Sequence, residues 1–188
     1  LDDCICQLRP RYALALAEYR RLHEHKTRIL RDSEEKPSLL DTLDEFSLGM
    51  AKAGALLIHY RAHFIKRLCQ AAPAIHGDFS GGREQLSIGW ESPAYAPGMT
   101  PAAVAARWKA LLETSRNADR AAGFSTVGPH REELALTLND TDVRTYGSQG
   151  QQRSAVLALK LAEAALLQDV TGEAPVAFLD DVMSELDV

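Results

Sequence analysis

Residues 134–180 carry three patterns in immediate succession, a hairpin, a helix and a buried strand. Leucines that alternate with smaller residues from position 134 to 138, followed by the turn Asn-Asp-Thr-Asp, predict the hairpin. Ser148 can cap a helix from about residue 150 to 168, and Gly172 lies just past its end. The run PVAFLD, residues 175–180, is typical of a buried strand whose carboxyl end reaches a site.

Two segments upstream have the spacing of amphipathic helices. The turn-like DSEEKPS at residues 32–38 separates them, which favours an antiparallel helical hairpin, or arm, over residues 11–72. Two ordinary bundle helices fit the periodicity equally well. The side chains at steps of three and four are Tyr12, Leu16, Tyr19, His23, Lys26 and Leu30 in the first segment, and Leu43, Phe46, Met50, Ala53, Leu57, Tyr60 and Phe64 in the second.

Residues 75–95 are rich in glycine and predict short strands and turns rather than helix. The Gly81-Gly82 pair is not followed by the lysine of a phosphate-binding loop, so it predicts a turn. Thr100 and Pro101 predict the start of another helix, which should end before Gly123.

The composition indicates a folded chain that does not cross a membrane. Of its 188 residues, 46% are hydrophobic and 25% are charged, and no apolar run approaches the roughly 18 residues of a membrane span. The first residues, LDDCICQL, lack the features of a secretory signal, and the three cysteines do not have the spacing of a disulfide framework or zinc site. We therefore expect reduced cysteines and a cytoplasmic protein.

The charge is unevenly distributed along the chain. The net charge of −5 argues against a protein that coats nucleic acid, yet residues 9–31 contain seven Arg or Lys and only two Glu. This segment is a candidate surface for DNA phosphates, and an ordinary solvated helix face is the alternative. The candidate DNA-binding residues are Arg20, Arg21, Lys26 and Arg28.

Two adjacent acids, Asp180 and Asp181, follow the predicted strand at residues 175–180. Nucleotide-hydrolysing folds use this arrangement to present one carboxylate to Mg²⁺ and to place a second near the attacking water. Taken alone, the pair is also typical of a solvated turn or a helix cap.

Four runs of sequence together resemble one family. DDVMSELD, residues 180–187, resembles the Walker B and D-loop segment of ABC-type ATPases, and SQGQQ, residues 148–152, resembles their LSGGQ signature motif, from which Gly147 and Gln149 depart. With GPHREEL at 128–134 and ALKLAE at 158–163, these runs look like RecF, a family of SMC-related recombination mediators of bacteria. The likeness covers nearly the whole chain and is weakest at residues 75–95.

The resemblance implies a mixed α/β fold in which a helical arm hairpin joins part of an ABC-type P-loop ATPase head. Residues 1–120 would be the arm lobe, with its small strand-rich block near 75–95, and residues 121–188 would be the partial head. The signature motif would face the γ-phosphate of ATP bound by the other subunit of a homodimer. Its members would be Ser148, Gln149, Gly150, Gln151 and Arg153.

The resemblance also implies roles for the acids. Asp180 would hold Mg²⁺ through water, and Asp181 would orient or deprotonate the attacking water, where most ABC ATPases have glutamate. Ser184 and Asp187 would belong to the D-loop. Arg153 is equally compatible with a structural ion pair, and the roles of His130 and Arg131 in the Gly-Pro-His-Arg turn stay open between a family function and a structural joint.

Members of the family resembled would bind gapped, single-stranded and junction DNA in an ATP-dependent manner, and would help RecO and RecR to load RecA in DNA replication and recombinational repair. Such a protein would be nucleoid-associated. The 188 residues contain no Gly-Lys-Ser or Gly-Lys-Thr loop, so we expect an internal piece of a weak ATPase that is inactive alone. The alternatives are a catalytically inactive interaction module and a segment of another SMC-like ABC ATPase.

Overall fold

The computed structural model describes residues 1–176, which form two compact units that alternate along the chain. Unit 1 contains the described residues 1–4, 63–90 and 133–176, and unit 2 contains residues 5–62 and 91–132. The predicted domains, residues 1–120 and 121–188, are contiguous whereas these units are not, and the domain boundaries stay a prediction.

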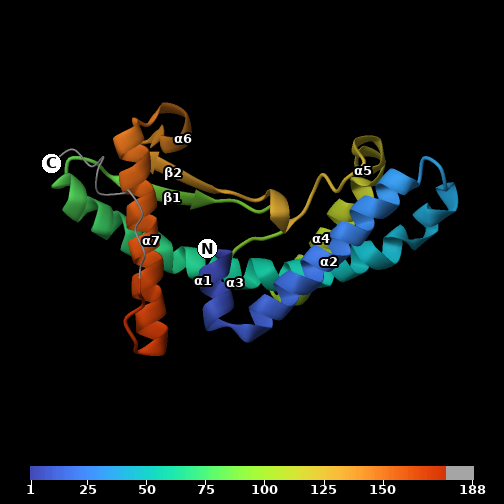
Figure 1. Ribbon diagram of the computed structural model, residues 1–188, viewed down its shortest axis with the longest axis horizontal. Helices are drawn as coiled ribbons and strands as arrows, with labels where there is room; N and C mark the ends of the chain where they lie inside the picture. The colour runs from blue at the N-terminus through green and yellow to red at the C-terminus, as the bar shows by residue number, and fades with distance from the viewer. Residues whose placement is uncertain (177–188) are drawn as a thin grey trace. The chain divides into compact units, whose positions relative to one another are not determined.

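Unit 2 is built from helices (Figure 1). After the short α1 (Asp2–Leu8), its elements are α2 (Pro10–Asp32), the 3₁₀ helix η1 (Pro37–Thr42), the first part of α3 (Leu43–Ser80), α4 (Pro101–Thr114), α5 (Arg116–Ala122) and the 3₁₀ helix η2 (Pro129–Arg131).

Helices α2 and α3 form the predicted antiparallel hairpin. Near the start of α2, the Tyr12 hydroxyl lies 3.3 Å from Nε of Arg61, and further along, the His25 ring stacks on Phe46 with 5.8 Å between centroids. A higher residue number on α2 is paired with a lower residue number on α3, so the helices run in opposite directions. Most side chains at the steps of three and four that predicted the hairpin are buried, whereas His23, Phe46 and Tyr60 are only half-buried.

Helix α4 begins where the sequence predicts. The Thr100 hydroxyl accepts a hydrogen bond from the Ala103 N–H at 3.3 Å, and Pro101 occupies the first helical turn. The buried side chains of α4 are Val104, Trp108 and Leu112. A break at Ser115 divides the predicted helix into α4 and α5, and Gly123 ends α5 in the left-handed conformation at φ 71°.

Unit 1 combines the last part of α3 with a small antiparallel sheet of order β1-β2-β3 and a long helix. The strands are β1 (Leu86–Trp90), β2 (Leu134–Leu138) and β3 (Thr141–Asp142), followed by α6 (Val143–Tyr146) and α7 (Gln149–Thr171). The β1–β2 register runs from Leu86 opposite Leu138 to Trp90 opposite Leu134. The short β2–β3 turn at residues 139 and 140 is the predicted hairpin.

Helix α7 crosses α3 (Figure 1), and the two are joined by an ion pair of 2.9 Å between Arg67 and Asp169 and by a contact of 3.2 Å between His76 and Ser154. The buried side of α7 is mostly alanine and leucine. The mixed α/β class predicted from the sequence is confirmed.

The prediction of turns and strands over residues 75–95 is wrong in its first third. Helix α3 continues through Pro73 and Gly77 to Ser80, and the block contains one strand, β1. The helix persists because every fourth side chain from 64 to 80 is buried, which outweighs the low helix propensity of glycine and proline. This stripe consists of Phe64, Leu68, Ala72, His76 and Ser80.

Within the described part of the chain, no helix has the combined length and apolar character that spanning a membrane requires. The predicted strand at residues 175–180 lies outside the described residues from position 177 onward.

Candidate functional site

The first turn of α7 is held by a capping box. The Ser148 hydroxyl oxygen accepts the Gln151 N–H at 3.2 Å, and the Gln151 side-chain oxygen accepts the Ser148 N–H at 2.9 Å. The first backbone bond of the helix runs from the Gln152 N–H to the Ser148 carbonyl. The N–H groups of Gln149 and Gly150 therefore lie before the first i to i−4 backbone hydrogen bond of the helix. They are at the positive end of the helix dipole.

The two glycines beside Ser148 differ in what the fold requires of them. A Cβ on Gly147 would lie 2.5 Å from the Val143 carbonyl oxygen, so the close turn from α6 to α7 needs glycine there. A Cβ on Gly150 would meet nothing closer than the Ser148 hydroxyl at 4.0 Å. The fold does not require glycine at position 150. Because glycine has no side chain, a ligand can closely approach the backbone at the first turn of α7, which we call the mouth of the helix.

The mouth of α7 lies in an open pocket of about 970 Å³ within unit 1. All five residues predicted for the signature motif line this pocket, so the structure brings them together. The other side of the pocket comes from the end of α3, the following turn and the β2–β3 turn. The lining residues outside the predicted motif include His76, Phe79, Arg83, Glu84, Asn139 and Ser154.

A chain of polar contacts joins the mouth of α7 to the wall of the pocket. The Gln151 side-chain nitrogen donates to Glu84 at 2.7 Å, and the Ser154 hydroxyl donates to the Gln151 carbonyl at 3.1 Å. Nε2 of the fully buried His76 lies 3.2 Å from the Ser154 hydroxyl and 3.8 Å from Glu84. His76 and Glu84 could not be recognised as site residues from the sequence, because they lie 78 and 67 positions from their partners and belong to no motif.

Four of the predicted site residues, Asp180, Asp181, Ser184 and Asp187, lie outside the described residues, and their predicted roles stay predictions. Among residues 1–176, no group of three or more His, Cys, Asp or Glu side chains is arranged to hold a metal ion.

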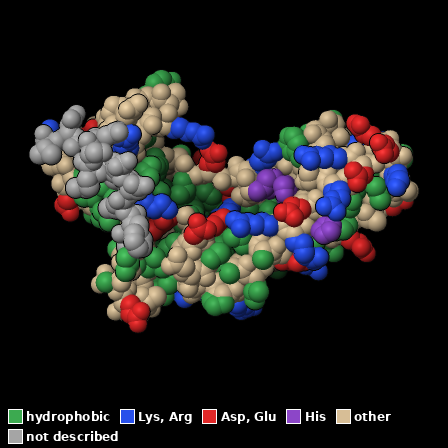
Figure 2. All heavy atoms as spheres, viewed as in Figure 1, with side chains coloured by type: hydrophobic (Ala, Val, Ile, Leu, Met, Phe, Trp, Pro, Cys, Tyr) green, Lys and Arg blue, Asp and Glu red, His purple; other side chains and the backbone are tan. Residues whose placement is uncertain are grey.

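Three of the four candidate DNA-binding residues are exposed on α2. Arg20 and Arg28 are exposed, and Arg21 donates two hydrogen bonds to Glu18 on the same helix, at 3.0 and 2.9 Å. Figure 2 shows basic and acidic side chains interspersed on the face in view rather than one continuous basic patch. On this face, contact with phosphates would therefore depend on individual arginines.

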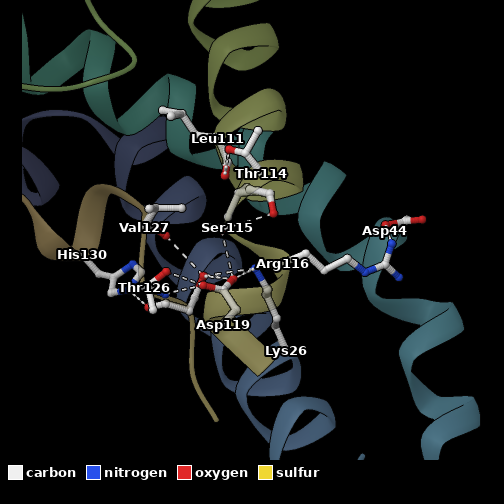
Figure 3. A network of polar contacts seen from close by, with 12 residues as sticks. Lys26, Asp44, Leu111, Thr114, Ser115, Arg116, Asp119, Thr126, Val127 and His130 are labelled. Carbon is white, nitrogen blue, oxygen red and sulfur yellow. Dashed lines mark hydrogen bonds and ion pairs between the residues drawn. The ribbon is translucent and has the colours of Figure 1, made fainter. Parts of the chain in front are cut away.

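The prediction that Lys26 contacts DNA conflicts with the position of its side chain. Lys26 is only 2% exposed, and its ammonium nitrogen lies 2.7 Å from the Asp119 carboxylate and 3.1 Å from the Ser125 hydroxyl (Figure 3). Asp119 also accepts two hydrogen bonds from Thr126, at 2.7 and 2.6 Å. A signal was present in the sequence, because Lys26 occupies a position on the buried stripe of its helix.

Electrostatics agree with a structural role for this pair. Burial alone would raise the pKa of Asp119, but the hydrogen bonds from Lys26 and Thr126 outweigh it and hold the pKa below its ordinary value. The carboxylate thus stays charged opposite the ammonium group, and the pair links α2 to α5 and the segment that follows.

The Gly128–Arg131 turn packs inside unit 2. The Tyr19 hydroxyl donates to Nδ1 of His130 at 2.7 Å, because Nε2 of His130 faces the Ser125 carbonyl oxygen at 3.2 Å and must carry the proton. Burial lowers the pKa of His130 to about 4, and His23 acts in the same direction. A Cβ on Gly128, at φ 146°, would lie 2.3 Å from the Tyr19 hydroxyl, so only glycine fits.

These contacts favour the structural interpretation of the Gly-Pro-His-Arg turn within unit 2. The Pro129 carbonyl accepts a hydrogen bond of 2.7 Å from Arg61 on α3, and the Arg131 guanidinium lies 4.9 Å from the centre of the Phe124 ring. The histidine and the arginine of the turn are both engaged with neighbouring side chains.

Comparison with known proteins covers the chain from end to end. No model of a protein family matches it. The chain is 37% identical over 199 residues to the DNA replication and repair protein RecF of Synechocystis sp., and 38% identical over 189 residues to that of Alkaliphilus oremlandii. Each alignment covers 100% of this chain and 51% of the relative.

Solved structures that resemble this chain are also RecF proteins. The recombination mediator protein RecF-ATPrS in the RecFOR pathway is similar with a TM-score of 0.89 and 33% identity over 99% of this chain and 50% of that protein. RecF-ATP in the same pathway gives a TM-score of 0.87 and 33% identity. The chain therefore belongs to the RecF family, and it spans about half the length of the curated relatives that it matches.

Proposed function

We propose that this chain supplies the mouth of α7 to an ATP-binding site that is shared between two subunits of an ATP-dependent, DNA-binding recombination mediator. The observation that carries the proposal is the open helix mouth itself. The N–H groups of Gln149 and Gly150 precede the backbone ladder, and no side chain at position 150 blocks their approach.

A triphosphate is the class of ligand that this mouth favours. Helix N–H groups and the positive end of the dipole attract an anion, and a phosphate group offers several acceptor oxygens. The Ser148 hydroxyl lies at the same point, and two arginines, Arg83 and Arg153, line the surrounding pocket. The solved relatives described as RecF-ATP and RecF-ATPrS support ATP as the nucleotide.

The remaining parts of the proposed site come from the acids that follow the described residues. Asp180 would hold Mg²⁺ through water, which would offset phosphate charge, and Asp181 would orient or deprotonate the attacking water. The D-loop residues Ser184 and Asp187 would lie between the two sites of the dimer. A carboxylate shorter than glutamate at position 181 is consistent with slow hydrolysis.

DNA would be bound through its phosphates, with Arg20 and Arg28 as the candidate contacts on α2 and Arg21 as a weaker one because it pairs with Glu18. The solved relatives are described as belonging to the RecFOR pathway, and this supports RecR and RecO as partners. The loading of RecA would be the outcome, as the resemblance to the family implies.

The test is ATP-dependent self-association of the full-length gene product. Ser148→Arg places a large side chain in the mouth of α7 and should prevent ATP-driven dimerisation, while each monomer still binds nucleotide. Self-association equal to that of the unaltered protein would contradict the proposal.

A further inference from the structure

Glu84 lies in the turn between α3 and β1 and reaches the mouth of α7 from 67 positions away in sequence. Its carboxylate accepts a hydrogen bond of 2.7 Å from Nε2 of Gln151. The oxygen of the same Gln151 amide accepts the Ser148 N–H at 2.9 Å. Both ends of the Gln151 amide are therefore engaged, one with the pocket wall and the other with the start of the helix.

The carboxylate of Glu84 fixes which way the Gln151 amide points. A carboxylate only accepts hydrogen bonds, so the amide nitrogen must face it. The reversed amide would place its oxygen against the carboxylate and its nitrogen against the Ser148 N–H, which loses two hydrogen bonds. Only the observed orientation closes the capping box.

A closed capping box determines what Ser148 can offer to a ligand. The Ser148 hydroxyl oxygen accepts the Gln151 N–H at 3.2 Å with a lone pair, and its hydrogen can then donate outward to an anion. If the Gln151 side chain turned away, the Ser148 N–H would lose its acceptor and the first turn would loosen. The geometry of the helix mouth thus depends on a side chain outside the helix.

The far side of Glu84 is supported by the buried His76 of α3 and the half-buried Ser154 of α7. The Ser154 hydroxyl donates to the Gln151 carbonyl, so it accepts from Nε2 of His76, whose side chain is fully buried. Nε2 of His76 lies 3.8 Å from the second carboxylate oxygen of Glu84. The contacts of Glu84 therefore belong to a network that spans three segments of unit 1.

We propose that Glu84 is a positioning residue of this site, which holds the Gln151 amide so that Ser148 and the first N–H groups of α7 are arranged for the γ-phosphate. The inference rests on the proposed function, which identifies the anion as ATP. Glu84 does not contact the phosphate, because two anions would repel each other at short range.

The first experiment needs no nucleotide. Solvent exchange of the Gln151 side-chain amide protons is measured by NMR in the full-length gene product. Glu84→Ala should accelerate this exchange by about tenfold, the factor that corresponds to one net hydrogen bond. Glu84→Gln retains an acceptor oxygen and should restore slow exchange. Asp78→Ala is the matched control, since it removes an exposed carboxylate from the end of α3 that does not line the pocket.

The second experiment measures the ATP concentration at half-maximal self-association. Glu84→Ala should raise this concentration by about tenfold, Glu84→Gln should return it to within about twofold of the unaltered value, and Asp78→Ala should leave it unchanged. Thermal melting of each variant verifies that the fold is retained, because Glu84 is a partly exposed residue in a turn.

The outcomes separate the inference from the proposed function. If Ser148→Arg prevents self-association but Glu84→Ala associates and exchanges as the unaltered protein does, the positioning role of Glu84 is wrong and the proposed function stands. If Glu84→Gln shows the same fast amide exchange and the same raised ATP concentration as Glu84→Ala, the hydrogen bond to Gln151 does not position the site, and the inference is overturned. If Ser148→Arg has no effect, the proposed function itself fails.

Discussion

The ammonium group of Lys26 lies 2.7 Å from the carboxylate of Asp119 in the interior of unit 2, and the two side chains are 3% and 0% exposed. Removing one member of such a pair leaves an uncompensated buried charge. Lys26→Met should therefore lower the free energy of unfolding by about 3 to 5 kcal/mol. Urea denaturation gives the measurement.

Arg20→Met is the matched control for Lys26→Met, because Arg20 is exposed on the same helix. It should change the free energy of unfolding by no more than about 0.5 kcal/mol. Equal stability losses in the two variants would contradict the structural role of Lys26.

Because the pKa of His130 is lowered, we expect the folded chain to lose stability in mild acid. The pKa of this imidazole is lowered from 6.5 to about 4 in the folded chain, chiefly by burial. Between these two pH values the unfolded chain binds the proton and the folded chain does not, so stability falls as the pH falls through this window. Urea midpoints between pH 7 and pH 4.5 should show the decrease.

The variant His130→Asn tests whether this histidine is responsible. It should be less stable at pH 7, because the bonds to Tyr19 and Ser125 change, but its urea midpoint should depend less on pH over the same range. His23, whose pKa is also lowered by burial, will retain part of the dependence. An unaltered pH profile in the variant would assign the acid sensitivity to other groups.

The sequence alone predicted those features whose stabilising contacts join residues close together in the chain. The beginnings of α4 and α7 follow from Thr100 and Ser148, and their capping bonds join residues three positions apart. The bond between Glu84 and Gln151 joins residues 67 positions apart, and that between Lys26 and Asp119 joins residues 93 apart. Such contacts follow from tertiary packing, which periodicity does not specify.

The error at residues 75–80 has the same origin. Pro73 and Gly77 are weak helix formers, and local propensity favoured turns. Burial of Ala72 and His76 in unit 1 keeps α3 helical to Ser80, and this extension brings His76 and Glu84 to the pocket.

The glycines on either side of Ser148 should separate folding from function. Gly147→Ala forces a Cβ against the Val143 carbonyl and should lower the free energy of unfolding by about 1 to 3 kcal/mol. Gly150→Ala has space and replaces glycine in a helix, so stability should be unchanged or higher by up to about 1 kcal/mol. The same variant should weaken ATP-driven self-association, measured by sedimentation. Unchanged self-association would show that position 150 does not face the nucleotide.

DNA binding tests the exposed arginines of α2. Reversing two charges with Arg20→Glu and Arg28→Glu should weaken DNA affinity and reduce the slope of log K against log salt by about two, if each arginine neutralises one phosphate. Fluorescence anisotropy over a salt series gives both quantities. The charge-matched control is Arg107→Glu with Arg120→Glu, two exposed arginines of α4 and α5. Equal losses in both double variants would indicate a net-charge effect rather than a binding surface.

The most direct measurement is ATP-dependent self-association of the full-length gene product carrying Ser148→Arg, by sedimentation velocity. Gln168→Arg, exposed near the far end of α7, is the matched control. We predict that Ser148→Arg stays monomeric at ATP concentrations that fully dimerise the control, while nucleotide binding to the monomer is unchanged. Dimerisation of Ser148→Arg at the same ATP concentration as the control would contradict the assignment of the α7 mouth to the shared site.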